Sequence, residues 1–162
     1  MAVRSILSDI GSNVEIYIDA DACPVKDEAL RVAMRHNLKT YMVSDGGIRP
    51  SNNPLVELVI VAQGPDAADN WIAEKISRFD ICVTNDIPLA ARCIENGAFA
   101  IKPNGEHFSE NSIGMALANR ELMQNLRESG EITGGPKPFS KTDRSRFLDG
   151  LENLVQSAIR QS

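Results

Sequence analysis

The chain alternates short apolar segments rich in β-branched residues with segments whose apolar residues recur every three or four positions. The first pattern is typical of strands buried in a parallel sheet, and the second is typical of helices that pack on such a sheet. Along residues 14–104 the two patterns give the order β-α-β-β-α-β-α-β, followed by helical segments. The sequence therefore predicts a three-layer α/β fold with a mostly parallel sheet of about five strands and C-terminal helices.

Turn and cap residues place the ends of these elements. Pro24 suits the first turn of a helix, because its missing N–H has no intrahelical partner there, and Gly97 is a helix C-cap signal. The expected strands cover residues 14–18, 39–43, 57–62, 81–84 and 98–101. The expected helices cover residues 24–37, 66–77, 88–95, 113–128 and 140–159. We expect a single domain over residues 1–162, with an α/β core at 13–104 and a helical extension at 110–160.

Composition limits the classes to which the protein can belong. A formal net charge of −5 disfavours sequence-independent binding to duplex nucleic acid, which depends on neutralising phosphates. No apolar run approaches the ~20 residues that cross a bilayer, and residues 1–13 lack the features of a secretory signal. The three cysteines show no Cys-x-x-Cys spacing and there are two histidines, so a zinc site is not expected. We expect a cytoplasmic protein.

Aspartates lie where expected strands end or helices begin. Asp19 and Asp21 follow the first strand, Asp66 and Asp69 open a helix, and Asp86 follows the fourth strand. In a parallel sheet the carboxyl ends of neighbouring strands meet at one crevice, so we expect these side chains to gather there. Crowded carboxylates repel each other, and a hard divalent cation relieves the repulsion. The sequence therefore predicts an acidic crevice that holds Mg²⁺ or Mn²⁺.

Each of these acids also has a structural interpretation. Aspartate is favoured at helix N-caps and in first turns, which is sufficient for Asp21, for one of Asp66 and Asp69, and for Asp86 taken alone. It is least satisfactory for Asp19, which closes an otherwise apolar strand. Cys23 is expected to be a small, partly buried residue, because no histidine is placed to activate its thiol.

The chain also contains six longer motifs. They are Y-I-D-A-D-A-C-P-V-K-D-E at 17–28, V-S-D-G-G-I-R-P-S at 43–51, G-P-D-A-A-D-N-W-I-A-E at 64–74, T-N-D-I-P-L-A at 84–90, P-N-G-E at 103–106 and G-G-P-K-P-F-S at 134–140. These motifs resemble the bacterial YaiI/YqxD family, whose members have no assigned reaction. The resemblance covers residues 14–154, nearly the whole chain.

That family is similar in layout to PIN-like nuclease domains, which bind a divalent metal through clustered acids and cut RNA. The resemblance implies that Asp19, Asp69 and Asp86 hold the metal, with Asp66 as the less favoured alternative to Asp69. PIN domains also carry a carboxylate in a middle helix, for which Glu28 is the nearest equivalent here, without a clean match. Residues 21 and 23, an aspartate and a cysteine, belong to the narrower family and suggest chemistry other than ordinary RNA cleavage.

Three functions are compatible with these residues. The leading hypothesis is a Mg²⁺- or Mn²⁺-dependent phosphodiesterase of PIN-like type, a hydrolase acting on RNA, in which Asp21 or Asp66 supports the ligands or acts as a base. The second is a phosphatase resembling the haloacid dehalogenase group, with Asp19 as nucleophile and Asp21 as acid and base, although no lysine is well placed for it. The third is a module that binds nucleic acid or protein without turnover.

The phosphodiesterase hypothesis also predicts contacts with phosphate. Residues 135–146 carry four basic residues against a single acid, which makes this segment a candidate surface for an anionic substrate. The role of the loop at 134–139 is left open. The residues expected to contact phosphate are Ser44, Arg49, Lys137 and Arg144.

Overall fold

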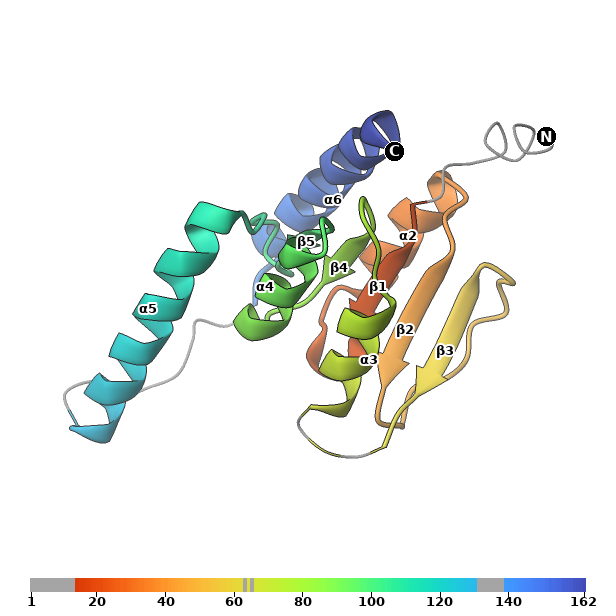
Figure 1. Ribbon diagram of the computed structural model, residues 1–162. Helices are drawn as coiled ribbons and strands as arrows, with labels where there is room; N and C mark the ends of the chain where they lie inside the picture. The colour runs from red at the N-terminus through yellow and green to blue at the C-terminus, as the bar shows by residue number, and fades with distance from the viewer. Residues whose placement is uncertain (1–13, 63, 65, 131–138) are drawn as a thin grey trace.

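A five-stranded parallel sheet forms the centre of the molecule, with strand order β3-β2-β1-β4-β5 (Figure 1). The structure is a computed structural model that describes residues 14–62, 64, 66–130 and 139–162. Each neighbouring pair of strands is parallel, so the predicted α/β fold with a parallel sheet and C-terminal helices is confirmed. The strands are β1 (Ile16–Asp19), β2 (Thr40–Ser44), β3 (Val56–Ile60), β4 (Ile81–Val83) and β5 (Phe99–Ile101).

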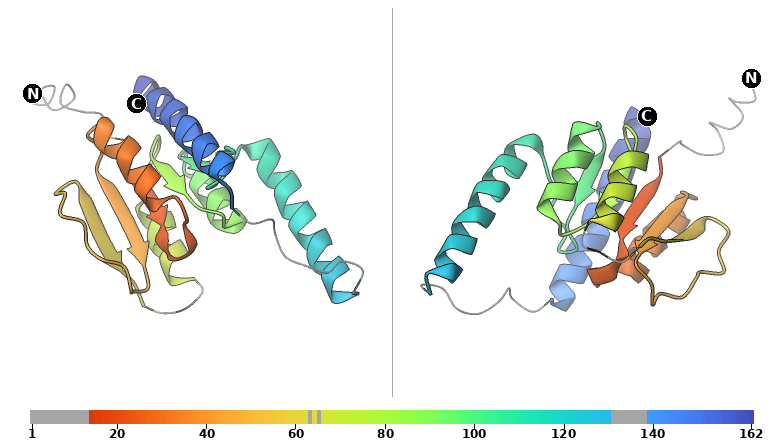
Figure 2. Two further views of the ribbon diagram at one scale, coloured as in Figure 1. Left: turned by 180° about the vertical axis from the view of Figure 1, so that it is seen from behind. Right: turned by 60° about the horizontal axis from the view of Figure 1, so that its bottom comes forward.

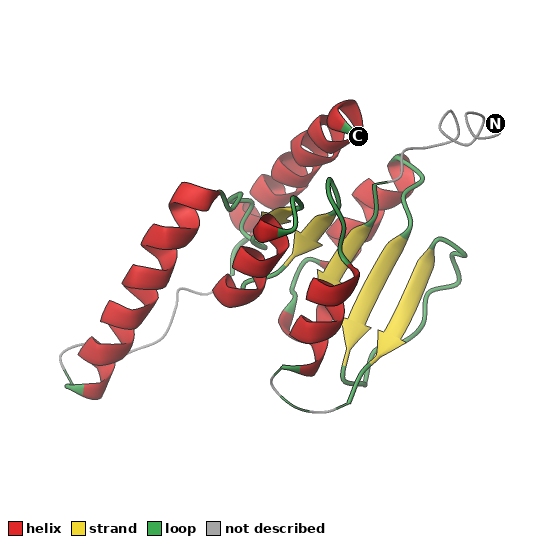
Figure 3. Ribbon diagram, viewed as in Figure 1, coloured by secondary structure: helices red, strands yellow, loops and turns green. Residues whose placement is uncertain are grey.

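Helices cover both faces of this sheet, as Figure 2 shows from two further sides. Helices α2 and α6 lie on one face, and α3 and α4 lie on the other; Figure 3 separates the two kinds of element by colour. The helices are η1 (Ala20–Ala22, a 3-10 turn), α2 (Lys26–Arg35), α3 (Ala67–Lys75), α4 (Ile87–Glu95), α5 (Glu110–Glu128) and α6 (Lys141–Gln161).

Side chains of the central strand alternate between the two halves of the core. Ile16 and Ile18 of β1 are fully buried against α2 and α6, whereas Tyr17 packs among residues of α3 and α4. This alternation follows from the two-residue period of a strand, and it explains why β1 and β4 are apolar at every core position. Polar side chains therefore follow at the carboxyl ends of these two strands.

Two of the observed helix starts differ from the expected ones by two residues or more. The first helix begins at Lys26, because the chain after β1 first forms the 3-10 turn, so Pro24 does not lie in the first helical turn. Helix α5 begins at Glu110, three residues earlier than expected, because Ser109 and Ser112 form a reciprocal capping box. A backbone turn sets the boundary at α2 and a capping box sets it at α5, and the spacing of apolar residues reveals neither.

The two C-terminal helices pack on different parts of the core. Helix α6 lies along α2 and β5 and buries Phe147 and Leu151, whereas α5 contacts α4 and extends away from the sheet (Figure 1). In α5 the buried residue is Ile113, near its start. Residues 131–138, with most of the loop at 134–139, lie outside the described residues. Among the helices that are described, none is long and apolar enough to cross a membrane.

Candidate functional site

Asp19 ends β1 beside β4, which holds its carboxylate in place. Ile18 pairs with Val83, and the next residue along that neighbouring strand, Thr84, donates a hydrogen bond from Oγ1 to Asp19 Oδ2 at 2.8 Å. Burial raises the pKa of Asp19, and the carboxylates of Asp86 and Asp21 raise it further, while the hydrogen bond from Thr84 lowers it. Asp19 is therefore a half-buried acid surrounded by other acids.

Asp86 caps α4 and lies beside Asp69 of α3. Its Oδ1 accepts a hydrogen bond from Leu89 N at 2.8 Å, so the helix-cap interpretation is correct for this residue. Burial raises the pKa of Asp69 to about 6, and the carboxylates of Asp86 and Asp19 and a hydrogen bond with Asp86 add to this effect. Residues 19, 69 and 86 thus come from three separate segments and lie close enough for the carboxylates of Asp19 and Asp86 to raise the pKa of Asp69.

Asp21 turns towards the end of β2 and does not cap α2. Its carboxylate accepts a hydrogen bond from Ser44 Oγ at 2.6 Å and another from Asp45 N at 3.1 Å, whereas the N-cap of α2 is Val25. Ser44 is fully buried. Its enclosed hydroxyl supports Asp21, and a direct contact between Ser44 and phosphate stays a prediction.

The other predicted residues lie at the margin of this group. Asp66 is exposed at the N-cap of α3 and makes no side-chain cap, but its charge contributes to the raised pKa of Asp69. Arg49 is exposed in the loop after β2. Lys137 lies outside the described residues.

Arg144 is tied to the start of α2. Its Nη1 donates to Pro24 O at 2.7 Å and forms an ion pair with Glu28 at 3.2 Å. Glu28, the nearest equivalent of the middle-helix carboxylate of PIN domains, is thus paired with an arginine. Both contacts of Arg144 use Nη1, so its Nε and Nη2 groups have no hydrogen-bond partner among the described residues and can still donate to a phosphate.

A cavity of about 360 Å³ opens beside the acids, within the range of small-ligand sites. Cys23 lies in its wall, more deeply buried than expected, and burial raises the pKa of its thiol. The side chains that line the cavity are Asp19, Cys23, Thr84, Asn85, Asp86, Ile87, Pro88, Pro103 and Arg120.

The donor set suits a hard cation. Over residues 14–62, 64, 66–130 and 139–162, no group of three or more His, Cys, Asp or Glu side chains is arranged to hold a metal ion. Mg²⁺ is commonly bound by one or two carboxylates with water completing its shell, and two carboxylates, those of Asp19 and Asp86, line the cavity. The residues therefore fit Mg²⁺ or Mn²⁺ held largely by water, with residue 69 beside the pair.

Two residues of the site were not singled out from the sequence. Thr84 orients Asp19. The sequence feature that could have indicated this role is the position of Thr84 at the end of an apolar strand. Arg120 of α5 lines the cavity, and its signal was its spacing from Ile113 and Ala116, which places a charge on the face of the helix that begins apolar. A charge in such a stripe is a reason to look for a ligand.

The molecule is thus an α/β protein whose parallel sheet carries interacting aspartates at its carboxyl edge. The chain belongs to the family described as "Uncharacterized BCR, YaiI/YqxD family", which matches residues 17–157. It is 57% identical over 147 residues to a UPF0178 protein of Parvibaculum lavamentivorans, covering 91% of this chain and 97% of the relative. No solved structure matches the chain.

Two further relatives show the same extent of similarity. A UPF0178 protein of Roseobacter denitrificans is 59% identical over 144 residues, covering 88% of this chain and 95% of the relative. A UPF0178 protein of Paramagnetospirillum magneticum is 53% identical over 146 residues, covering 90% of this chain and 97% of the relative. The names of these relatives state no reaction, so a function has to be argued from the site.

Proposed function

We propose that the protein is a Mg²⁺- or Mn²⁺-dependent phosphodiesterase of PIN-like type that acts on RNA. Asp19 and Asp86, which line the cavity, hold the metal together with water, Asp69 adds its charge beside them, and Asp21 and Asp66 support the group. The observation that carries the proposal is that burial and the neighbouring carboxylates raise the pKa of both Asp19 and Asp69. Bringing acids together in this way is unfavourable without a counter-charge, which a divalent cation supplies.

The roles of the side chains follow from their surroundings. A bound divalent metal supplies positive charge to a phosphoryl oxygen and lowers the pKa of bound water. Thr84 and the cap of α4 keep Asp19 and Asp86 oriented towards the cavity.

The phosphatase hypothesis has less support. It needs a lysine beside the nucleophile, and Lys26, the lysine that follows Asp19 in the chain, donates to Cys23 O at 3.0 Å and to Ala20 O at 3.5 Å. This lysine braces the turn after β1 and does not line the cavity. A covalent adduct on Asp19, trapped with beryllium fluoride, would reverse the order of the two hypotheses.

The direct test is a calorimetric titration of Mn²⁺ into the protein, Asp19→Asn and Asp86→Asn. Asparagine keeps the acceptors for Thr84 and for Leu89 N, so the fold is retained while the charge is removed. We expect micromolar binding that both substitutions abolish. Asp149→Asn is the matched control, because Asp149 is exposed on α6 and does not line the cavity.

The titration leads to a nuclease assay. Mn²⁺-dependent cleavage of RNA that is lost in Asp19→Asn supports the proposal. Absence of Mn²⁺ binding by the unmodified protein contradicts it. Normal Mn²⁺ binding with no turnover of RNA, DNA or small phosphoesters supports the non-catalytic module instead.

A further inference from the structure

The cavity beside the aspartates brings opposite charges together. Asp19 and Asp86 line it from β1 and from the start of α4, and Arg120 lines it from α5. Within the part of the chain that the structure describes, Arg120 is the cationic side chain among the lining residues. A site of this composition matches a ligand that carries an anionic group of its own next to a metal held by the acids.

Arg120 makes no hydrogen bond, ion pair or ring contact with any other described residue. Arg35 and Arg144, by comparison, each pair with a glutamate. Arg120 is exposed, but it lies at the edge of a cavity that two carboxylates also line. Its guanidinium keeps all its donors for a ligand, and their planar fork suits the oxygens of a phosphate group.

Helix α5 places Arg120 where its apolar face would otherwise continue. Ile113 is buried against α4, Ala116 is partly buried, and Arg120 follows at the same helical spacing. The contact between α5 and α4 therefore determines where Arg120 stands relative to Asp86, the cap of α4.

The remaining walls indicate what else the ligand carries. Ile87, Pro88 and Pro103 give the cavity an apolar side, and Asn85 adds an amide without a partner among the described residues. An apolar wall with a few polar groups suits a planar or sugar-like organic group, and about 360 Å³ is sufficient for a ligand of nucleotide size.

We propose that Arg120 binds the phosphate of a nucleotide whose organic part packs on Ile87, Pro88 and Pro103. This inference rests on the proposed function, because the acids hold the metal that shares the phosphate. The same chemistry is offered by a free mononucleotide and by the phosphorylated end of an RNA strand.

The test measures binding of adenosine 5′-monophosphate in the presence of Mn²⁺ to the unmodified protein, Arg120→Gln and Arg127→Gln. Arg127 is the matched control, because it is exposed in the last turn of α5 and does not line the cavity. We expect Arg120→Gln to weaken nucleotide binding about tenfold or more, as for loss of a charge-assisted hydrogen bond. Binding of Mn²⁺ alone is retained in both variants.

Each outcome separates the two proposals. If the unmodified protein binds Mn²⁺ but Arg120→Gln binds nucleotide equally well, or if no nucleotide binds at all, the role of Arg120 is overturned while the metal site stands. If the unmodified protein binds no Mn²⁺, the proposed function itself fails.

A second experiment compares the binding of RNA tetranucleotides that carry a 5′-phosphate or a 5′-hydroxyl. Tighter binding of the phosphorylated strand that depends on Arg120 identifies the RNA end as the ligand. Equal binding of the two strands identifies the free nucleotide.

Discussion

Thr84 Oγ1 donates a 2.8 Å hydrogen bond to Asp19 Oδ2. Thr84 Oγ1 also accepts a 2.9 Å hydrogen bond from Asp86 N. One buried hydroxyl at the end of β4 thus orients two of the acids that line the cavity. Its donation to the carboxylate also opposes the effect of burial on the pKa of Asp19. The charge of this acid therefore depends on a neighbour that carries no charge.

Replacing Thr84 with valine tests this relationship at nearly constant volume. Asp19 loses its donor and Asp86 N loses its acceptor, so we expect Mn²⁺ affinity near neutral pH to fall about tenfold, the effect of roughly 1.5 kcal/mol. Calorimetric titration measures the change. Thr40→Val is the control, because Thr40 is equally buried in β2 but donates to Leu38 O. An unchanged Mn²⁺ affinity in Thr84→Val would show that the hydroxyl does not control Asp19.

Ser44 is predicted to support the fold around Asp21. Its hydroxyl is buried, donates to Asp21 Oδ1 and accepts from Gly46 N at 3.0 Å. Ser44→Ala leaves both groups without this partner, so we expect the free energy of unfolding in urea to fall by about 1–2 kcal/mol. Ser77→Ala, at an exposed position after α3 where the hydroxyl has no partner among the described residues, should change it by less than about 0.5 kcal/mol. Equal effects of the two substitutions would contradict the role assigned to Ser44.

The sequence predicted the centre of the sheet well because the apolar residues of β1 and β4 are buried on both faces. Apolar residues at every position of 16–18 and 81–83 identify central strands, and aspartates just after them identify the polar edge. Register and burial were harder to predict. Ser44 was expected to be open to a ligand, and only the pairing of β2 with β1 and β3 shows that its side chain is enclosed.

Contacts between elements distant in sequence explain what the sequence did not reveal about the site. Glu28 and Arg144 are 116 residues apart, and their ion pair depends on how α6 lies on α2. Arg120 reaches the cavity only because α5 packs on α4. The spacing of apolar residues predicts that such helices exist, but not the angle at which they meet their neighbours. The positions of Arg120 and of the Glu28–Arg144 ion pair could therefore not be predicted from the sequence.

Two helical glycines are predicted to respond in opposite ways to alanine. A Cβ at Gly150 of α6 would lie 2.7 Å from Gly105 O and 3.3 Å from Ile101 Cδ1, whereas a Cβ at Gly114 of α5 meets nothing within 4 Å. We expect Gly114→Ala to stabilise the protein by about 0.5–1 kcal/mol through helix propensity. Gly150→Ala should destabilise it by about 1–3 kcal/mol, because α6 has to move away from the loop after β5. Urea unfolding measures both, and stabilisation by Gly150→Ala would contradict the close packing of α6.

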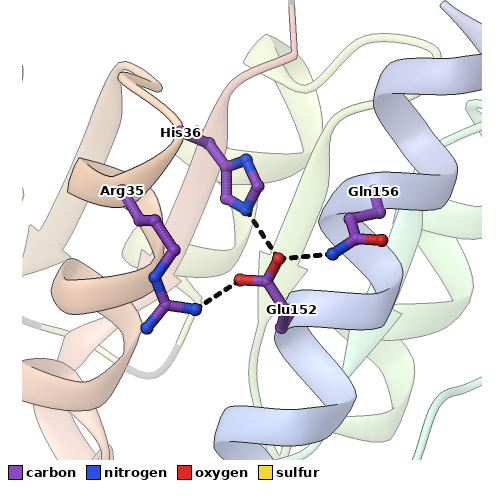
Figure 4. A network of polar contacts seen from close by, with 4 residues as sticks. All are labelled: Arg35, His36, Glu152 and Gln156. Carbon is purple, nitrogen blue, oxygen red and sulfur yellow. Dashed lines mark hydrogen bonds and ion pairs between the residues drawn. The ribbon is translucent and has the colours of Figure 1, made fainter.

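Glu152 joins α6 to α2, as Figure 4 shows, and is predicted to make stability depend on pH. Its carboxylate accepts hydrogen bonds from Gln156 Nε2 at 2.7 Å, His36 Nε2 at 2.9 Å and Arg35 Nη1 at 2.7 Å. These contacts, with that from Gln156 the largest, lower the pKa of Glu152 from 4.5. A lowered pKa in the folded state means that the unfolded chain binds the proton more readily, so the stabilisation is present above pH 4.5 and is lost as pH falls through the folded-state value.

Glu152→Gln removes this titration while keeping the size of the side chain. We expect its free energy of unfolding near neutral pH to be lower than that of the unmodified protein by about 1 kcal/mol, a modest value because the site is partly open to solvent. The difference should shrink as the pH is lowered towards about pH 4, since the unmodified protein then loses the same contribution. Glu74→Gln, at an exposed position of α3, is the control and should show no pH-dependent difference. A difference for Glu152→Gln that stays constant across this range would show that the ionised carboxylate is not what links α6 to α2.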